Sequence, residues 1–266
     1  MKFKDVEERV RGIPFISRSD AKYLYNLILD EDISDILELG IAHGTATCYM
    51  AAALEERGGG SITAVDLSER AAHYQPSAEE QLAKHGFESL VTIARMQTGY
   101  TWFLHDAIRA ATTDGHCEPC YDLCIIDGPK NWTIDGAAFF MADKLLRKDG
   151  WLVFDDYDWS YGRADESREA TDGITHRALS EDERRMPQIK EVFELLVQQH
   201  PDYSNFKVIN ENWAIAQKTR SGVSETTYVD KHRDLEGGPA NRAFRKLRRA
   251  AKQSIRSARG TRRKAP

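Results

Sequence analysis

The sequence predicts an α/β protein built on a doubly wound, mostly parallel sheet of about seven strands with a reversed edge strand. The first observation is that short apolar runs alternate with segments of helical periodicity between residues 36 and 200. This order puts helices on both faces of a parallel sheet. The second is that two final β-prone runs, 206–209 and 213–216, are separated by a tight turn and therefore form a hairpin.

Each element is expected from its own residues. Residues 1–35 read as helical, with a start at Ser19 and Asp20, and would pack on the sheet or over a ligand entrance. The glycine run 58–60 ends the helix that follows the first strand. The expected strands are 36–39, 61–66, 91–94, 121–127 and 151–154, and the expected helices are 45–57, 78–85, 101–111, 133–146 and 187–200.

A glycine-punctuated turn joins the first strand to its helix. It contains Glu38, Gly40 and Gly44, and Thr45 opens the helix. A strand that stops at glycine and restarts as a helix gathers backbone N–H groups and a helix N-terminus at one point, which suits a polar or anionic ligand group. The spacing Glu38-x-Gly40-x-x-x-Gly44 differs from the dinucleotide pattern G-x-G-x-x-G.

The ends of the next two strands supply further candidate ligand contacts. Asp66 closes the second strand, where a carboxylate can accept both ribose hydroxyls of an adenosine. A solvated turn aspartate is the alternative. Gln97 and Thr98 follow the third strand and would border the adenine ring.

The E-x-G-x-x-x-G turn and the order of elements resemble class I S-adenosylmethionine (SAM)-dependent methyltransferases over roughly residues 36–218. The resemblance implies a Rossmann-like fold and SAM as cofactor, with the glycine turn on its amino-acid end. Downstream, Asp127-x-x-Lys130 followed by Asp155-Asp156 resembles the metal-dependent catechol-type O-methyltransferases. The macrolide-sugar and antibiotic O-methyltransferase branch is also similar to this chain over the sequence segments IDGPKNW and LLRKDGWLVFDDYD. In that branch the Lys130 position is commonly histidine.

Three carboxylates should meet at the ends of two neighbouring strands. Asp127 ends the fourth strand, and Asp155 and Asp156 end the fifth, an interval of 28 residues that fits a strand–helix–strand unit. Like charges in one crevice need protonation, a cationic partner or a metal, and an oxygen-only ligand set suits Mg²⁺ before Ca²⁺ or Mn²⁺. We expect Mg²⁺ at these three residues, with Asp127 also touching the cofactor. Alternatively, one of the adjacent pair caps a helix and the other contacts a substrate cation.

The resemblance implies that Mg²⁺ orients a substrate hydroxyl toward the SAM methyl group while Lys130 and Asp127 act in catalysis. Lys130 or a water would take the hydroxyl proton. A free lysine titrates near 10.4, about three units above neutrality, so this role needs a lowered lysine pKa or a metal-acidified substrate. The alternative is that Lys130 is a counter-ion to Asp127 or Asp156.

A long polar segment, residues 158–186, interrupts the alternation directly after the fifth strand. Long connections of this kind inside a domain are usually functional lids or disordered insertions. Because the segment leaves the sheet edge where α/β proteins bind ligands, we favour a lid over the substrate.

The four cysteines fit a reduced cytosolic protein better than a disulfide scaffold. Cys117-x-x-Cys120 beside His116 lacks a convincing fourth zinc ligand, since Cys124 lies in an apolar strand. A loop followed by a buried thiol is the preferred interpretation. The absence of a long apolar run and the charged start argue against a membrane span and a secretory signal.

Charge is distributed unevenly along the chain. Residues 240–266 carry eleven Lys or Arg and no acid, so this tail is +11 and the remaining 239 residues sum to −16. Apolar residues at steps of three or four in the tail predict a basic amphipathic helix after a linker at 219–239. An anionic membrane surface is the favoured partner of the tail, and nucleic acid is less favoured because the tail has few aromatic residues for stacking.

Two classes of function fit these observations. The first is a SAM-dependent, Mg²⁺-dependent O-methyltransferase acting on a sugar, a glycan or a phenolic natural product, with a metal-independent methyltransferase as its variant. The second is a membrane- or RNA-binding protein whose SAM domain does not catalyse. A homodimer is what the family resemblance implies.

Overall fold

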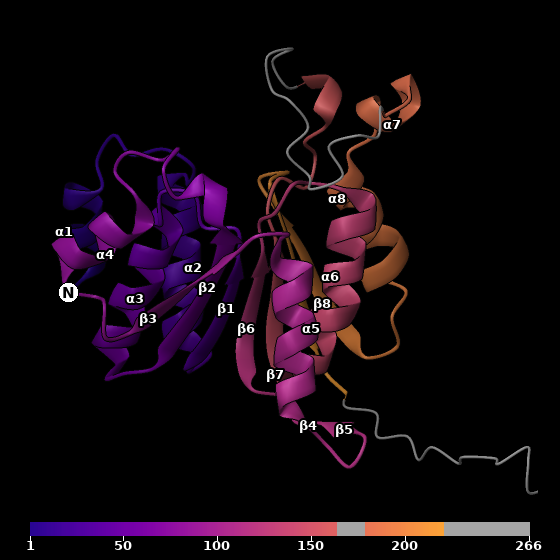
Figure 1. Ribbon diagram of the computed structural model, residues 1–266, viewed down its shortest axis with the longest axis horizontal. Coiled ribbons are helices and arrows are strands. Elements are labelled where there is room, and N and C mark those ends of the chain that lie inside the picture. The colour runs from indigo at the N-terminus through magenta and orange to yellow at the C-terminus, as the bar shows by residue number, and fades with distance from the viewer. Residues whose placement is uncertain (164–178, 221–266) are drawn as a thin grey trace, which may run out of the picture. The chain divides into compact units, whose positions relative to one another are not determined.

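The computed structural model describes residues 1–163 and 179–220. In this part of the chain the main sheet has seven strands in the order β3-β2-β1-β6-β7-β9-β8 (Figure 1). β9 runs antiparallel to both of its neighbours, while β1, β2, β3, β6 and β7 are parallel. The strands are β1 (Asp35–Leu39), β2 (Ser61–Leu67), β3 (Val91–Met96), β6 (Tyr121–Ile126), β7 (Leu146–Phe154), β8 (Tyr203–Ile209) and β9 (Trp213–Lys218).

Helices connect the parallel strands. Glycine or helix-capping residues stand at the ends of several of these helices. Gly44 and Gly58 flank α3 in left-handed conformation, with φ of 72° and 106°, and Ser77 and Glu80 form a capping box at the start of α4. The helices are α1 (Phe3–Arg9), α2 (Arg18–Asp30), α3 (Thr45–Arg57), α4 (Ala78–His85), α5 (Tyr100–Ala111), α6 (Trp132–Leu145), α7 (Glu181–Arg185) and α8 (Gln188–Glu191), which continues as the π-helical η3 (Val192–Val197); η1 (Ser68–Arg70) and η2 (Tyr161–Arg163) are short 3₁₀ turns.

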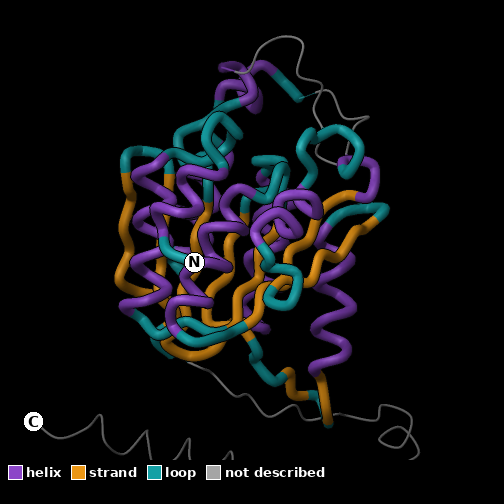
Figure 2. The backbone as a smooth tube through the Cα atoms, turned by 90° about the vertical axis from the view of Figure 1, so that its left-hand side faces the viewer, coloured by secondary structure: helices purple, strands orange, loops and turns teal. Residues whose placement is uncertain are grey.

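The sheet separates two apolar cores, because successive side chains of a strand point to opposite faces. In β1, Ile36 packs with α1–α4 on one face, whereas Leu37 and Leu39 pack with α5, α6 and α8–η3 on the other. Figure 2 shows the strands of the sheet in orange and the helices that pack over them in purple. The predicted α/β fold with about seven strands is confirmed, and the reversed strand is β9, inside the edge strand β8.

Strand register brings the predicted site residues to one edge of the sheet. Leu39 of β1 pairs with Ile126 of β6, and Ile126 pairs with Phe154 of β7. The residues that follow, Gly40, Asp127 and Asp155, are therefore neighbours. Backbone hydrogen bonds continue the pairing, since the Asp127 N–H donates to Leu39 O at 2.8 Å and the Asp155 N–H to Ile126 O at 3.2 Å.

Two local predictions were wrong. The cysteine-rich segment is a small hairpin of β4 (Thr112–Thr113) and β5 (His116–Cys117) and not an irregular loop. Residues 147–150, expected to end a helix, lie in β7, because that strand begins at Leu146. Cys48 and Cys124 are buried free thiols, and Cys117 and Cys120 are half-buried.

Several predictions fall on residues that the structure does not describe. They concern residues 164–178 of the expected lid, most of the linker at 219–239 and the whole basic tail at 240–266. The lid, the linker and the tail stay predictions. Across residues 1–163 and 179–220, no helix combines the length and apolar character that crossing a bilayer requires.

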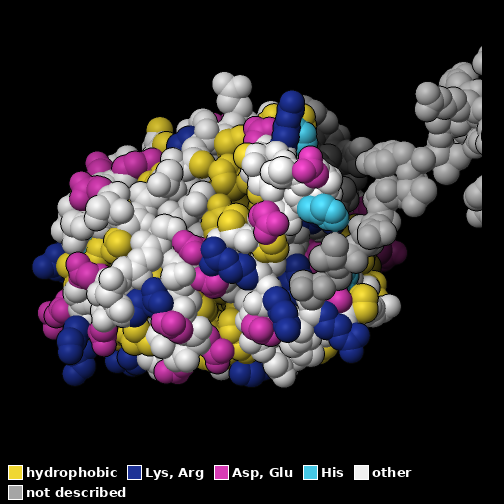
Figure 3. All heavy atoms as spheres, turned by 90° about the horizontal axis from the view of Figure 1, so that it is seen from below, with side chains coloured by type: hydrophobic (Ala, Val, Ile, Leu, Met, Phe, Trp, Pro, Cys, Tyr) yellow, Lys and Arg dark blue, Asp and Glu magenta, His cyan; other side chains and the backbone are white. Residues whose placement is uncertain are grey.

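One face of the molecule, seen in Figure 3, carries acidic and basic side chains interspersed with one another. A surface that binds nucleic acid through its backbone presents clustered positive charge. The nucleic-acid alternative concerns residues 240–266, which lie outside the described residues, and stays a prediction.

Candidate active site

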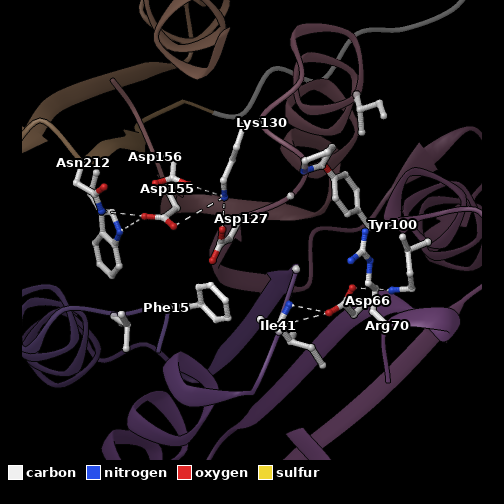
Figure 4. A pocket seen from close by; sticks show the side chains of 18 of the residues that line it. Phe15, Ile41, Asp66, Arg70, Tyr100, Asp127, Lys130, Asp155, Asp156 and Asn212 are labelled. Atoms are coloured by element: carbon white, nitrogen blue, oxygen red, sulfur yellow. Dashed lines mark hydrogen bonds and ion pairs between the residues drawn. The ribbon is translucent and has the colours of Figure 1, made fainter. Parts of the chain in front are cut away.

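A cavity of about 1160 Å³ lies at the carboxyl ends of the parallel strands. This is the edge where α/β sheets bind ligands. It extends from the turn after β1 to the loops after β6 and β7, and the segments that contribute lining residues are 15–20, 40–42, 66–74, 98–101, 127–134, 155–156 and 210–213. Figure 4 shows the two ends of this cavity, with Asp66 and Ile41 at one end and Asp127, Lys130, Asp155 and Asp156 at the other.

Gly40 is where the glycine turn and the loop after β6 come into contact. Its φ of +96° is in the left-handed region, and a Cβ at this position would overlap the carbonyl oxygen of Asp127. The Gly40 N–H also donates to Val65 O at 2.8 Å, which ties the turn to β2. Glycine is required here both by the backbone conformation and by the close approach of a neighbouring chain segment.

The remaining residues of the predicted motif support the turn from behind and do not line the cavity. Gly44 packs on Ala78, whose Cβ would lie 2.9 Å from an added Cβ. The Thr45 hydroxyl donates to Pro14 O at 3.2 Å. The Glu38 side chain is 2% exposed and accepts a hydrogen bond of 2.6 Å from the Thr47 hydroxyl.

Glu38 makes a testable contribution to stability. Burial, partly offset by the Thr47 hydroxyl and reinforced by the charge of Asp66, raises the pKa of Glu38 from 4.5 to about 8. Between these pH values the folded protein keeps a proton that the unfolded chain has released, so the free energy of unfolding falls as pH rises through this window. Glu38→Gln keeps an acceptor for Thr47 and removes the titration.

We expect the parent to lose roughly 3 kcal/mol of unfolding free energy relative to Glu38→Gln between pH 5 and pH 8. Urea denaturation at a series of pH values measures this difference. Exposed Glu88 provides a matched control, because Glu88→Gln should follow the parent at every pH. Parallel curves for the parent and Glu38→Gln would contradict the assignment.

Asp66 fixes the glycine turn while bordering the cavity. One carboxylate oxygen accepts from the backbone N–H groups of Ile41 (3.3 Å) and Ala42 (3.1 Å), and the other accepts from Leu67 N–H at 2.7 Å. Its predicted contact with ribose stays a prediction. Thr98 also lines the cavity, whereas Gln97 is exposed and does not.

A hydrogen-bonded pair in the wall of the cavity was not predicted from the sequence. The Tyr100 hydroxyl donates to Asp135, and the other oxygen of Asp135 accepts from the Asn131 N–H at 2.6 Å. Burial raises the pKa of Asp135 from 3.8 to about 6, although the hydrogen bond from Tyr100 and the charge of Lys130 lower it in part. An acid within the apolar sequence of α6 is a signal of such a pair, but its partner lies 35 positions away.

The N-terminal segment forms one wall of the cavity. The sequence alone did not decide where this segment packs. α1 and α2 pack on the sheet, and both Phe15, which lies between them, and Asp20, in the first turn of α2, line the cavity. The Phe15 ring stacks on His43 of the glycine turn, with ring centroids 5.5 Å apart. The segment therefore packs on the sheet and lines the cavity, and its predicted place over a cofactor entrance stays a prediction.

Asp127, Asp155 and Asp156, here called the carboxylate cluster, meet around the Lys130 ammonium (Figure 4). Lys130 Nζ contacts Asp127 Oδ1 and lies 3.8 Å from Asp155 Oδ2 and 3.5 Å from Asp156 Oδ2. Burial alone would lower the pKa of Lys130, but the three neighbouring carboxylates together raise it above its usual value. This geometry favours the counter-ion alternative for Lys130 over the role of base.

The hairpin between β8 and β9 anchors one member of the carboxylate cluster. Asp155 Oδ1 accepts from Asn212 Nδ2 at 3.0 Å and from Trp213 Nε1 at 2.6 Å. The same turn reaches the N-terminal wall, where Asn210 Nδ2 donates to Asp20 Oδ1 at 3.5 Å. Three distant parts of the chain therefore shape one end of the cavity with carboxyl and amide groups.

Comparison with known proteins identifies the centre of the chain. Residues 37–157 match the family model described as a methyltransferase domain. This part of the chain is therefore similar to methyltransferase domains. No curated protein matches the chain.

Solved structures share the fold of this part of the chain and of its flanking elements. A putative caffeoyl-CoA O-methyltransferase from Staphylococcus aureus is 22% identical with a TM-score of 0.58, and the match covers 82% of this chain and 93% of that one. An O-methyltransferase from Bacillus cereus, in complex with SAH, is 20% identical with a TM-score of 0.55, and the match covers 82% of this chain and 92% of that one. TomG, an O-methyltransferase from Streptomyces achromogenes in complex with SAM, is 19% identical with a TM-score of 0.52, and the match covers 81% of this chain and 87% of that one. The predicted class I methyltransferase resemblance is confirmed.

Proposed function

We propose that the protein is a SAM-dependent O-methyltransferase acting on a small hydroxylated acceptor. The observation that carries the proposal is one continuous cavity, with the glycine turn and Asp66 at one end and the carboxylate cluster with Lys130 at the other. A methyl donor and an acceptor bound at these two ends would meet inside the cavity. Bound SAH and SAM in the O-methyltransferases from Bacillus cereus and Streptomyces achromogenes support SAM as the donor.

The donor end would use the backbone of the glycine turn and the cavity-lining face of Asp66. The turn is preorganised, because Asp66 already holds the Ile41 and Ala42 N–H groups. Tyr100 borders this end and is fixed by its buried hydrogen bond to Asp135. Fixed polar groups lower the cost of ordering the site when the cofactor binds.

At the acceptor end, a hydroxyl would donate a hydrogen bond to an oxygen of the carboxylate cluster. As the new oxygen–carbon bond forms and the sulfur–carbon bond of SAM breaks, that carboxylate takes the hydroxyl proton. The products are a methyl ether and S-adenosylhomocysteine. The Lys130 ammonium holds the carboxylates together and offsets negative charge that develops on the attacking oxygen.

The expected Mg²⁺ would require the same three carboxylates. Their oxygen-only chemistry suits the ion, but the Lys130 ammonium contacts all three. Among residues 1–163 and 179–220, no group of three His, Cys, Asp or Glu has metal-binding geometry. Because the ammonium fills the space between the carboxylates, this arrangement does not fit a metal, and the proposed methyl transfer uses none. Mg²⁺ dependence stays a prediction that activity in EDTA tests.

The acceptor end favours a molecule with several hydroxyl groups. Asp20, Asn210 and Asn212 line it beside the carboxylate cluster, and carboxyl and amide groups are suited to hydrogen-bonding hydroxyls. Phe15 is 56% exposed and adds an apolar surface to the same cavity. We therefore place sugars and other polyols ahead of simple phenols among the acceptors proposed from the sequence.

Release of S-adenosylhomocysteine tests the proposal. The full chain is incubated with SAM and panels of sugars, catechols and amines, and the released product is quantified by mass spectrometry. We expect release with at least one hydroxylated class and a methyl ether in the acceptor. SAM binding without release for any acceptor would favour the non-catalytic alternative, and release confined to amines would overturn transfer to oxygen.

A further inference from the structure

We propose that the Lys130 ammonium occupies the place where a divalent ion would bind, so that the carboxylate cluster carries its cation within the chain. Within the described residues, Lys130 is the lysine whose Nζ contacts Asp127, Asp155 and Asp156 together. An ammonium has three N–H donors and no acceptor, which matches three carboxylates. The inference concerns the resident cation and goes beyond the proposed methyl transfer.

The ammonium is enclosed, as a structural ion would be. Lys130 is 8% exposed although it lies beside a large cavity. A buried ion pair is kept only where geometry and charge compensate the loss of water. The three neighbouring carboxylates supply that compensation for Lys130.

The backbone fixes Lys130 in this position. Lys130 and Asp156 have φ of +63° and +60°, a region in which non-glycine residues are strained and which often marks functional sites. The turn is held on both sides of Lys130, by the Tyr161 hydroxyl that donates to Pro129 O at 2.5 Å and by the Asn131 N–H that donates to Asp135 at 2.6 Å. Lys130 is thus presented to the carboxylate cluster by a constrained segment.

A divalent ion and this ammonium would compete for the same oxygens. Mg²⁺ binds oxygen at about 2.0–2.1 Å, so an ion that reached all three carboxylates would displace the ammonium and meet repulsion from its charge. Asp155 has its Oδ1 committed to Asn212 and Trp213, which leaves Oδ2 to face a cation. Removal of the lysine charge should therefore uncover a divalent-ion site.

Binding of Mn²⁺ alone measures this directly, since the electron paramagnetic resonance signal of free Mn²⁺ falls as the ion binds. We compare the full-length parent with Lys130→Met and Lys130→Gln, which remove the charge, and Lys130→Arg, which keeps it. Neither neutral variant leaves an ammonium among the carboxylates. We expect both neutral variants to bind one Mn²⁺ per chain at least tenfold more tightly than the parent or Lys130→Arg. Adding Asp156→Asn to Lys130→Gln should reverse the gain.

Lys130→Met leaves three carboxylates without a cationic partner and is expected to be less stable, so a second measurement is included. Lys130→Gln can donate a hydrogen bond to a carboxylate and should fold more readily. Mn²⁺ should raise the melting temperature of each neutral variant and leave that of the parent unchanged. Mn²⁺ binding by the parent as tight as that of folded Lys130→Gln would overturn the inference. Because SAM and acceptor are absent, such a result leaves the proposed methyl transfer untouched.

Discussion

Gly40→Ala should remove SAM binding and destabilise the protein. The added Cβ would overlap the Asp127 carbonyl oxygen, at a backbone φ of +96° that alanine rarely adopts. Either β1 or the loop after β6 must move, and both carry the predicted site. Overpacking and left-handed strain together cost on the order of 3 kcal/mol. The same displacement moves the glycine turn, so we expect the free energy of SAM binding to weaken by a similar amount. This corresponds to a decrease in SAM affinity of at least about 100-fold.

Gly58→Ala is the matched control. Gly58 also has a left-handed φ, of +106°, but no atom lies within 4 Å of an added Cβ. This variant should show the strain cost alone and keep SAM affinity. Urea denaturation and titration calorimetry with SAM measure both variants. Equal SAM affinities in the two would show that the contact between Gly40 and Asp127 does not organise the donor end.

Asp127→Asn should reduce methyl transfer about 10²–10⁴-fold, the range that loss of a positioned acid or base produces. The Asp127 carboxylate contacts Lys130 and borders the cavity between its two ends. The substitution keeps the size of the side chain and removes its charge, so the ammonium loses one of its three partners. We expect the loss mainly in kcat, with SAM affinity changed less.

Asp158→Asn is the control for Asp127→Asn. Asp158 also follows a central strand, but it pairs with the exposed side chain of Arg163 at 2.8 Å and does not line the cavity. Its substitution should leave kcat within about twofold of the parent, since exposed ion pairs contribute little. Single-turnover kinetics with saturating SAM compare the variants. Equal rates for Asp127→Asn and the parent would remove Asp127 from the chemistry.

The sequence was informative where local rules and topology agree. The bounds of α3 and α4 match their predictions because glycine or capping residues stand at both ends of each helix. The convergence of Asp127 with Asp155 followed from strand adjacency. Parallel neighbours joined by one helix end at the same edge of a sheet.

The direction of individual side chains was harder to predict. Glu38 was expected to bind the cofactor, yet it turns toward α3 and pairs with Thr47. Lys130 was considered as a base. In the structure its backbone adopts a left-handed conformation, which places the ammonium among three carboxylates. Neither a buried hydrogen bond nor a left-handed lysine has a distinctive sequence pattern.

Contacts between distant segments were also beyond local rules. Asp155 is anchored by Asn212 and Trp213, which are nearly 60 positions away in the chain. Asp20 meets Asn210 at a separation of 190. Such pairs depend on how the N-terminal helices and the final hairpin close around the cavity, and this closure follows from tertiary packing.

The proposed reaction brings a SAM methyl group to an acceptor hydroxyl at the carboxylate cluster within one cavity. Its most direct test is a single turnover with SAM carrying a ¹³C-labelled methyl group and an acceptor found in the panel, followed by NMR of the product. We expect the label on an acceptor oxygen and its loss in Asp127→Asn. Label on nitrogen or carbon, or an unchanged yield from Asp127→Asn, would contradict the claim.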